Sequence, residues 1–437
     1  MSRPLAAPGR KRRVFCCLLH GEAVVKFRRC HILAVMPVEK VDFSVHQVFA
    51  GGAGLNVRRQ LQVLAAHLDQ PCVVDEEQCL FLFSCSPGIW QDMPGQEAQQ
   101  VLVQSLLALG LLFLEDTAMG QAWEADARLR EVPWWPLAAI HHRHARWHDV
   151  DSALEMRRNQ MVTADDLVRK LGKPPLEALP RQHNAYRLHT VEDDPAALAL
   201  SRRTTCRNFD PARPLSLALV SLLLQQVLMA QGQVETEPGV RFLKKNVPSA
   251  GGLHPVEAYL VVQNVEGLTA GLYHYHAVSH ELAATTSQPD DIAQFALQLL
   301  AGQDWFATAP VLVVLTCRFG RNFWKYRNHT KAYRAVCLDA GHVSQALYTA
   351  ATEQGLGAFV TAAINEHEIE TLLGTDPMQQ GALAVSGFGW RADTLVTPEF
   401  DPLGRSRQTQ VTASTRGGGP GRLAEQHAMH AATDALP

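Results

Sequence analysis

The sequence lacks a long apolar run and an excess of one charge, and we expect no secretory leader. A membrane-spanning helix needs roughly 20 apolar residues in succession, and the apolar segment 14–19 is followed at once by His20 and Glu22. That segment is also too short for a signal peptide. The formal net charge is −3, with both signs scattered along the chain. We therefore expect no membrane and no nucleic-acid partner.

Cysteine usage excludes two further classes of protein. The nine cysteines are an odd number and include no CxxC pair. An odd set argues against a disulfide framework, and the missing CxxC spacing argues against a zinc ribbon. We expect a protein of the reducing cytoplasm.

The length of 437 residues and the hydrophobic content of 47% predict two or three domains with sizeable cores. A stretch rich in Pro, Asp and Glu at 174–197 indicates a linker, and the polar C-terminus indicates a disordered tail. The predicted division is a variable N-terminus (1–29), a docking domain (30–125), a linker and arm (126–200), a catalytic domain (201–407) and the tail (408–437).

The docking domain is predicted to be winged-helix-like and α/β. Apolar residues at helical spacing predict a helix over 56–68. A second helix over 98–109 ends before Gly110, and a strand follows at 111–115. Because neither helix has a clustered basic face, we expect contact with a peptide or a protein partner.

The catalytic domain alternates helical and extended patterns and is predicted to be an α+β layer sandwich around one sheet. Its expected helices are 215–231, 291–301 and 333–354, and its expected strands are 256–263, 310–317, 358–364 and 382–386. The strand at 310–317 is apolar throughout, which predicts burial on both faces.

A basic segment, Arg202–Phe209, opens the catalytic domain. In an extended chain, side chains two positions apart share a face, so Arg203, Thr205 and Arg207 can converge. Two guanidinium groups and a hydroxyl suit a dianionic phosphate. A surface strand with solvated arginines is the alternative interpretation.

A loop of small residues, Pro248–Pro255, precedes the strand at 256–263. Small residues let the backbone approach a flat ring, and their N–H groups can bond ring heteroatoms. An ordinary turn would use the same residue types.

The third motif is Lys325-Tyr326, which lies ahead of the long helix. A lysine beside a tyrosine favours the phenolate, which can act as a general base. A solvated helix entry is the alternative. On the helix itself, Asp339 and His342 are one turn apart and could pair with each other.

Five segments, taken in order, resemble the motifs of the SagB-type dehydrogenases, a branch of the nitroreductase superfamily. The family motifs are R-R-S-x-R-x-F/Y, P-S-A/G-G-x-x-x-P, G-L-Y-x-Y, K-Y and D/E-A-G-H. The matching segments are Arg203–Phe209, Pro248–Pro255, Gly271–Tyr275, Lys325-Tyr326 and Asp339–His342. Four positions depart from the pattern. Thr204 stands where arginine or histidine is usual, and Thr205 replaces serine. His254 stands where tyrosine is common, and His329 stands where arginine is common.

The resemblance implies an α+β, nitroreductase-like FMN fold, with a central, mainly antiparallel sheet flanked by helices and two flavin sites at a homodimer interface. It assigns FMN binding to Arg203, Thr204, Thr205 and Arg207 at the phosphate, to Pro248, Ser249, Ala250, Gly251 and Gly252 of the other subunit at the isoalloxazine ring, and to Arg405 and Arg407 as a late basic pair.

The resemblance also implies that Lys325 and Tyr326 are catalytic in azoline oxidation. One of them would remove the α-proton of a thiazoline or oxazoline while hydride leaves the β-carbon for flavin N5. We expect the substrate to be a ribosomally made precursor peptide, with a cyclodehydratase as a further partner. The alternatives are a generic NAD(P)H-dependent nitro or quinone reductase, and an inactive peptide-binding scaffold.

Four histidines, at 141, 142, 144 and 148, lie in a segment that also holds three tryptophans. His144 and His148 have the i,i+4 spacing of a helical metal site. Spacing identifies no third ligand, so we expect an interface or a substrate channel here and no metal site.

Overall fold

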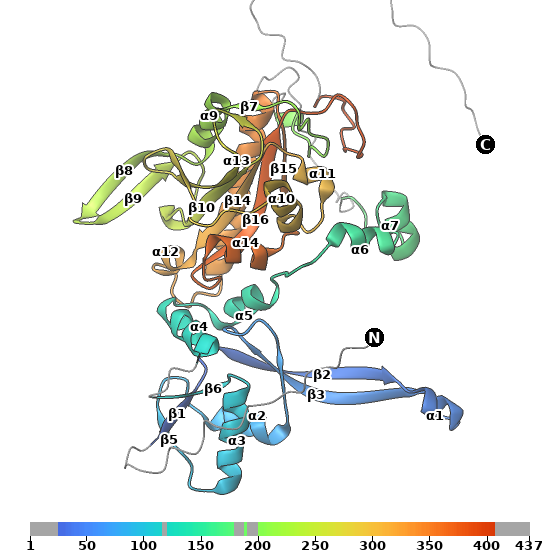
Figure 1. Ribbon diagram of the computed structural model, residues 1–437, viewed down its shortest axis with the longest axis vertical. Helices are drawn as coiled ribbons and strands as arrows, with labels where there is room; N and C mark the ends of the chain where they lie inside the picture. Colours follow the sequence, from blue (N-terminus) through green and yellow to red (C-terminus); the bar gives the residue numbers. More distant parts are fainter. Residues whose placement is uncertain (1–24, 116–119, 179–187, 190–199, 407–437) are drawn as a thin grey trace, which may run out of the picture.

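The computed structural model describes residues 25–115, 120–178, 188–189 and 200–406. The predicted tail at 408–437 lies outside these residues. Figure 1 shows an N-terminal part with a projecting hairpin, a C-terminal part built around one sheet, and a helical arm that joins them. None of the helices in the described part of the chain is both long and apolar enough to span a bilayer.

The C-terminal part is organised by a six-stranded sheet in the order β13-β12-β10-β14-β16-β15. All neighbouring strands are antiparallel. The strands are β10 (Val256–Val262), β12 (Gly271–His276), β13 (Glu281–Ala284), β14 (Val311–Arg318), β15 (Gly357–Thr361) and β16 (Gln380–Gly389). The predicted α+β fold with a central antiparallel sheet is confirmed.

Helices cover both faces of this sheet (Figure 1). The apolar strand β14 shows this directly: Val311, Val313 and Leu315 belong to a core with α9 and α13, whereas Leu312 and Val314 belong to a core with α10 and α14. Side chains of a strand alternate between its faces, so a strand covered on both sides is apolar throughout. The predicted two-sided burial of this strand is confirmed.

The remaining elements of the C-terminal part surround the sheet. They are β7 (Leu215–Ser216), α9 (Leu217–Val227), β8 (Ala230–Glu237), β9 (Val240–Lys245), the 3-10 turn η1 (Ala250–Gly252), β11 (Val265–Glu266), α10 (Ile292–Leu299), α11 (Asp304–Ala307), α12 (Phe319–Phe323), α13 (Ala332–Glu353) and α14 (Glu366–Leu373). The long predicted helix is α13. The helix expected over 215–231 ends at Val227, because Ala230 begins the β8–β9 hairpin.

Among its described residues, the N-terminal part contains two three-stranded sheets, one of which includes the hairpin, and three helices. Its elements are β1 (Lys26–Arg29), β2 (Leu33–Phe43), α1 (Val45–Phe49), β3 (Leu55–Ala65), β4 (Cys72–Val74), α2 (Glu76–Ser84), β5 (Gln91–Asp92), α3 (Glu97–Ala108) and β6 (Leu112–Leu114). The predicted helix at 98–109 and strand at 111–115 correspond to α3 and β6. The winged-helix-like description stays a prediction.

The helix predicted over 56–68 is wrong. This segment forms β3, which pairs with β2 from Leu33 opposite Ala65 to Phe43 opposite Leu55. The pairing satisfies the backbone of both strands, and the segment also carries alternating apolar residues at Val57, Leu61 and Val63 that suit a strand. The pairing with β2 therefore decides between the helical pattern and the extended pattern, both of which this segment contains.

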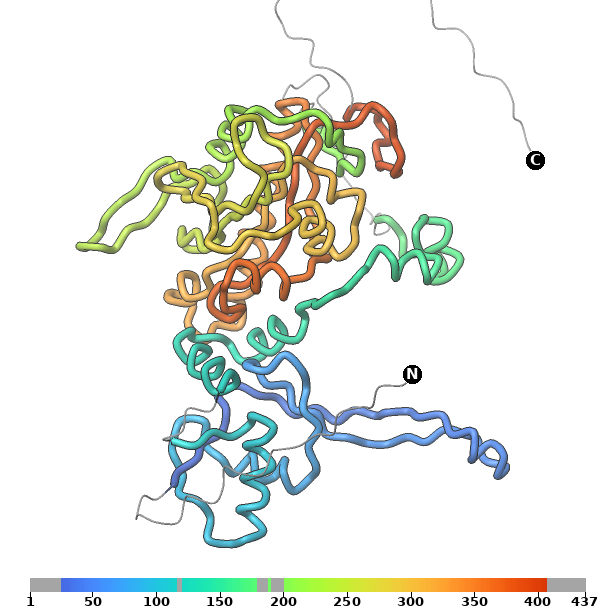
Figure 2. Tube along the Cα trace, in the orientation of Figure 1, coloured from blue at the N-terminus to red at the C-terminus, as the bar shows by residue number. Residues whose placement is uncertain are grey.

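The arm comprises α4 (Gly120–Glu131), α5 (Pro136–His144), α6 (Ser152–Arg158) and α7 (Ala164–Leu171). Figure 2 follows it from the N-terminal part along the lower edge of the C-terminal part. Apolar side chains of the arm and of the hairpin pack there on α12 and α13, in a set that we call the junction cluster. It includes Ile32, Leu129, Trp134, Ala139, Phe319, Phe323, Val336 and Met378.

His142 is buried beside the junction cluster and bonds both of its ring nitrogens. Its Nε2 lies 3.0 Å from the carbonyl oxygen of Pro377, and its Nδ1 lies 3.0 Å from the Tyr333 hydroxyl. A carbonyl oxygen only accepts, so Nε2 carries the proton and Nδ1 accepts from the tyrosine. Burial lowers the pKa of His142 to about 3, which keeps the ring neutral in this tautomer.

This histidine predicts a loss of stability in mild acid. The unfolded chain takes up a proton on the ring below a pKa of about 6.5, and the folded chain takes it up only near pH 3. Stability therefore falls as the pH drops through this window, by about 2 kcal/mol at pH 5 from His142 alone. Urea unfolding of the full chain at pH 7 and pH 5 should show a smaller pH effect for His142→Gln than for the parent. The exposed His276→Gln should keep the parental effect, and an unchanged effect in His142→Gln would contradict the assignment.

Candidate functional site

The arginine and threonine segment at 203–207 is extended along the end of β15. Thr205 forms a parallel bridge with Ala358, and the Cys206 N–H donates to the Ala358 carbonyl at 2.9 Å. Alternate side chains consequently differ in burial: Thr204 and Cys206 are buried, whereas Arg203, Thr205 and Arg207 are half-buried. The predicted sharing of one face by these three residues agrees with this alternation.

Arg203 and Thr205 meet α13 at Tyr348. The Thr205 hydroxyl lies 3.0 Å from the Tyr348 hydroxyl, and the Arg203 guanidinium lies over the Tyr348 ring at 5.3 Å. The Arg207 guanidinium lies 6.0 Å from the Phe306 ring. Among the residues that the structure describes, neither guanidinium has a carboxylate partner. Two half-buried cations beside a hydroxyl are a donor set that fits a phosphate.

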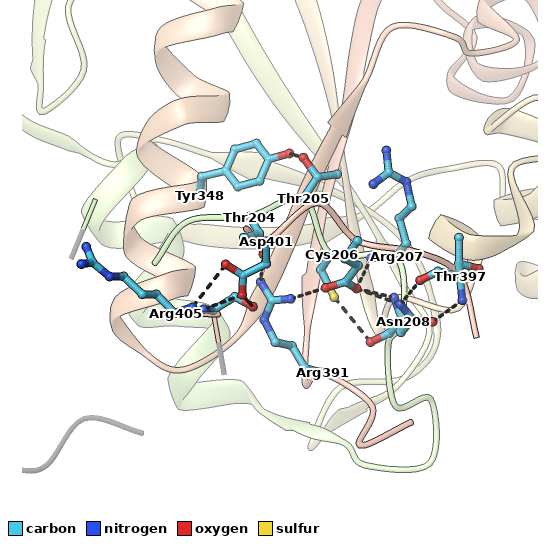
Figure 3. A network of polar contacts seen from close by, with 12 residues as sticks. Thr204, Thr205, Cys206, Arg207, Asn208, Tyr348, Arg391, Thr397, Asp401 and Arg405 are labelled. Carbon is cyan, nitrogen blue, oxygen red and sulfur yellow. Dashed lines mark hydrogen bonds and ion pairs between the residues drawn. The ribbon is translucent and has the colours of Figure 1, made fainter. Parts of the chain in front are cut away.

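The opposite side of the same segment is fixed by a buried ion pair between Arg391, which Figure 3 labels, and Glu399. Arg391 and Glu399 are 2.9 Å apart, and their side chains are 9% and 3% exposed. Arg391 also donates to the Thr204 hydroxyl at 3.0 Å, and Glu399 accepts from the N–H groups of Arg207 and Asn208 at 2.7 and 3.1 Å. The pair thus holds the backbone that presents the two free arginines.

Electrostatics keep Glu399 ionised in this position. Burial by itself raises the pKa of Glu399, but hydrogen bonds from backbone N–H groups and the charge of Arg391 outweigh it. The resulting pKa lies below the usual value of a glutamate. Thr204, one of the residues assigned to the phosphate, is directed to Arg391, so its part in cofactor binding stays a prediction.

The late basic residues lie partly at this site. Arg405 donates from Nη1 to the Ser201 hydroxyl at 3.0 Å, next to the arginine segment. Asp401 anchors the turn, because it accepts from the N–H groups of Arg405 and Ser406 at 3.2 and 2.9 Å. Arg407 lies outside the described residues.

The small-residue loop Pro248–Pro255 is held against α13 by Asp339. This carboxylate accepts from the Ser249 hydroxyl at 2.6 Å and from the Ala250 N–H at 3.0 Å. Burial raises the pKa of Asp339 above its usual value, although these hydrogen bonds oppose the shift. Asp339 therefore positions the loop, and the hydrogen bonds of its carboxylate go there and not to His342, with which a pair was predicted.

Lys325 and Tyr326 lie between α12 and α13 and reach the same loop at Gly251. A β-carbon placed on Gly251 would be 2.9 Å from the Tyr326 hydroxyl oxygen and 3.0 Å from Lys325 Nζ. Gly251 also has a φ of 64°, a conformation that side chains disfavour. Glycine is thus required twice, and its absence of a side chain lets the loop and the two predicted catalytic groups meet.

Helix α13 carries two anchoring residues, one for the arginine segment and one for the small-residue loop. Tyr348 contacts the arginine segment, and Asp339 binds the small-residue loop. The two anchors are nine positions apart on the helix, which corresponds to about 14 Å along the axis. The structure therefore brings the predicted residues together in two groups, with the arginines at one end of the helix and the loop with Lys325 and Tyr326 nearer the other.

The sequence patterns did not predict three residues that support the arginine segment, namely Tyr348, Arg391 and Glu399. Each touches the arginine segment across more than 140 residues of chain, and no local pattern links residues so far apart. Tyr348 carried a weak signal, because it is a polar aromatic residue on the inward face of a helix and a buried hydroxyl requires a partner.

Comparisons with known proteins place the C-terminal part in a family. The sequence model of the nitroreductase family matches residues 200–390 of this chain. Trifolitoxin-processing protein TfxB of Rhizobium leguminosarum bv. trifolii is 32% identical over 179 residues, which are 39% of this chain and 46% of that protein. The chain thus spans about half the length of this relative.

The chain is similar to two further proteins. A candidate nitroreductase of Methanocaldococcus jannaschii, MJ1384, is 31% identical over 152 residues, which are 34% of this chain and 72% of that protein. A chain in the solved Escherichia coli microcin synthetase McbBCD complex with truncated pro-MccB17 is 20% identical, with 62% of this chain and 93% of that chain covered and a TM-score of 0.44. The family model matches residues 200–390, and the chain covers 72% of the length of MJ1384. The chain therefore belongs to the nitroreductase family.

Proposed function

We propose that the protein is an FMN-dependent oxidoreductase of the SagB type, which matures a ribosomally synthesised peptide by oxidising a thiazoline or oxazoline to the azole. The observation that carries this proposal is the meeting of Lys325 and Tyr326 with Gly251 of the small-residue loop. Two groups able to exchange protons then border the loop that would lie against a flat cofactor ring.

The chain's residues fit FMN at both of its ends. The guanidinium groups of Arg203 and Arg207, which have no carboxylate partner among the described residues, would bind the phosphate together with the Thr205 hydroxyl. The small-residue loop has open space at Gly252, where a side chain would stand in the way of a flat ring, and in a homodimer the loop would face the ring bound by the partner subunit. When bound, FMN supplies a hydride acceptor, which a dehydrogenation requires.

Lys325 and Tyr326 would handle the proton. Azoline oxidation removes a proton from the α-carbon and a hydride from the β-carbon of the ring. Either the Tyr326 oxygen or Lys325 Nζ receives the proton, and the other group stabilises the charge change from close by, since Nζ lies 5.5 Å from the centre of the Tyr326 ring. The junction cluster packs against Tyr326 and fixes its position.

A peptide substrate is supported by the similarity to the trifolitoxin-processing protein. We infer that the N-terminal part docks the precursor peptide or a cyclodehydratase that forms the azoline. A second candidate function is a generic NAD(P)H-dependent nitro or quinone reductase, which the similarity to MJ1384 favours.

One experiment separates these functions. The purified chain should carry flavin absorbance, keep it under anaerobic NADPH, and lose it on addition of a peptide that contains a thiazoline. Bleaching by NADPH without peptide would favour the generic reductase instead. A preparation that binds no flavin would contradict both functions and favour a scaffold.

Variants test the two catalytic assignments. Lys325→Ala and Tyr326→Phe should keep FMN, and peptide oxidation should fall by about 10²- to 10⁴-fold for the residue that is the base, the usual contribution of general base catalysis. The exposed Lys331→Ala, in the same segment, is the control and should oxidise the peptide at the parental rate. Parental rates in both Lys325→Ala and Tyr326→Phe would sink the assignment.

A further inference from the structure

The arm is attached to the first turn of α14 by a set of polar contacts. The Trp147 N–H donates to Glu366 at 2.8 Å, and the Asp149 N–H donates to Glu368 Oε1 at 2.9 Å. Arg146 pairs with the buried Glu370. These contacts bring the last histidine of the arm next to residues more than 200 positions later in the sequence.

At this attachment, His148, His367 and Glu368 form a compact group of metal-ligating side chains. One ligand atom of each lies within 4.8 Å of those of the other two. The two histidine rings are 4.2 Å apart, and His148 Nδ1 is 2.7 Å from Glu368 Oε1. His367 and Glu368 are neighbours on α14, whereas His148 comes from the arm, so the group joins two separate segments.

Glu368 supplies a second, independent observation that points to a ligand. Its side chain is only 9% exposed. Oε1 accepts two hydrogen bonds, but Oε2 is buried and has no partner within the described residues. A buried carboxylate oxygen without a partner is costly, and Arg146, the arginine of this attachment, is already held by Asp69 and Glu370. A metal ion would satisfy this oxygen.

We propose that His148, His367 and Glu368 bind one divalent transition-metal ion, with Zn²⁺ as the best match to two imidazoles and one carboxylate. Zn²⁺ takes four ligands of this kind, and a site with three protein ligands leaves one position for water. A cavity of about 570 Å³, lined by the three ligands together with Asp290 and Asp291, supplies room for that water. The bound ion clamps the arm onto α14.

The site differs from the metal interpretation that spacing suggests. His144, four residues before His148, directs Nε2 to the Ala65 carbonyl at 3.2 Å and lies outside the group. The two further ligands come instead from α14 and become visible only when the chain is folded. No metal was expected because spacing identified no third ligand beside His144 and His148. In the proposed site, His148 is joined instead by His367 and Glu368.

The test uses the full chain after removal of metal with EDTA and dialysis. Titration with Co²⁺, followed by displacement with Zn²⁺, should show one ion per chain in the absorbance of the bound cobalt. His148→Ala, His367→Ala and Glu368→Gln should each weaken binding at least about 10- to 100-fold, because loss of even an outer-shell partner has that effect. His141→Ala, an exposed histidine of the same arm, should bind as the parent does.

Thermal unfolding supplies a second readout. Zn²⁺ should raise the unfolding temperature of the parent and of His141→Ala, and leave that of the three ligand variants unchanged. Absence of metal uptake by the parent would overturn the proposal, and so would parental affinity in the ligand variants. The outcome is independent of flavin content and of peptide oxidation.

Discussion

Replacement of Arg391 by alanine is expected to destabilise the protein by about 3–5 kcal/mol, the usual result of breaking a buried ion pair by removing one partner. The variant leaves Glu399, with a side chain only 3% exposed, without its counter-charge. It also removes the donor to the Thr204 hydroxyl. Because the pair holds the backbone of the arginine segment, flavin retention should fall together with stability. Urea unfolding and the flavin absorbance of the purified variant measure the two effects.

A surface ion pair of the same chain is the matched control. Arg241 and Glu235 are 3.1 Å apart, but their side chains are 60% and 45% exposed. Arg241→Ala should cost less than about 1 kcal/mol, as exposed pairs do. The double variant Arg391→Ala with Glu399→Gln should recover part of the lost stability, since it removes the uncompensated charge. A double variant as unstable as Arg391→Ala would show that this charge is not the cause.

Four strands of the central sheet, β10, β14, β15 and β16, could be predicted because they carry clear apolar patterns, whereas the edge strands β12 and β13 were not predicted. The strand at 310–317 has only one arrangement that buries every residue, with helices on both faces. The long helix around Asp339 has apolar residues at helical spacing over its whole length and ends just before Gly355. In the N-terminal part, the segment 55–65 fits both a helix and a strand, and its pairing with 33–43 decides between them.

The candidate site was predictable to the extent that its residues lie in short motifs. Extended geometry alone places Arg203, Thr205 and Arg207 on one face. The partners that fix these motifs lie far away in the sequence, as Asp339 does from Ser249, and only the fold brings them into contact. The metal-ligating group shows the same limit, since its ligands come from the arm and from α14.

The junction cluster lies next to the segment that carries Lys325 and Tyr326, the two proposed catalytic residues. Trp134 of the arm is its central side chain, with its ring centre 4.6 Å from that of Phe319 and 4.8 Å from that of Phe323. Both phenylalanines belong to α12, which immediately precedes Lys325, and the Asn328 N–H donates to the Pro133 carbonyl at 2.9 Å. The arm therefore supports the segment that carries the two proposed catalytic groups.

Trp134→Ala is accordingly expected to cost about 3–5 kcal/mol of stability, as the truncation of a buried aromatic residue does. The side chain is 2% exposed and its indole N–H donates to the Met378 carbonyl at 3.0 Å, so the variant creates a cavity and leaves a buried acceptor without its donor. Trp134→Phe should keep part of the ring contacts while losing the hydrogen bond and the volume of the second ring, and should therefore cost clearly less than Trp134→Ala. Leu137→Ala, an exposed position on the same arm, should stay within about 0.5 kcal/mol of the parent.

Activity distinguishes support of the catalytic segment from a purely structural role. If the arm positions Lys325 and Tyr326, Trp134→Ala should lower the rate of peptide oxidation at temperatures where circular dichroism shows it fully folded and flavin absorbance shows full occupancy. The hydrogen bond alone does not position the segment, so Trp134→Phe should retain most of the rate. A folded, flavin-loaded Trp134→Ala with the parental rate would show that the junction cluster stabilises the protein without orienting the catalytic pair.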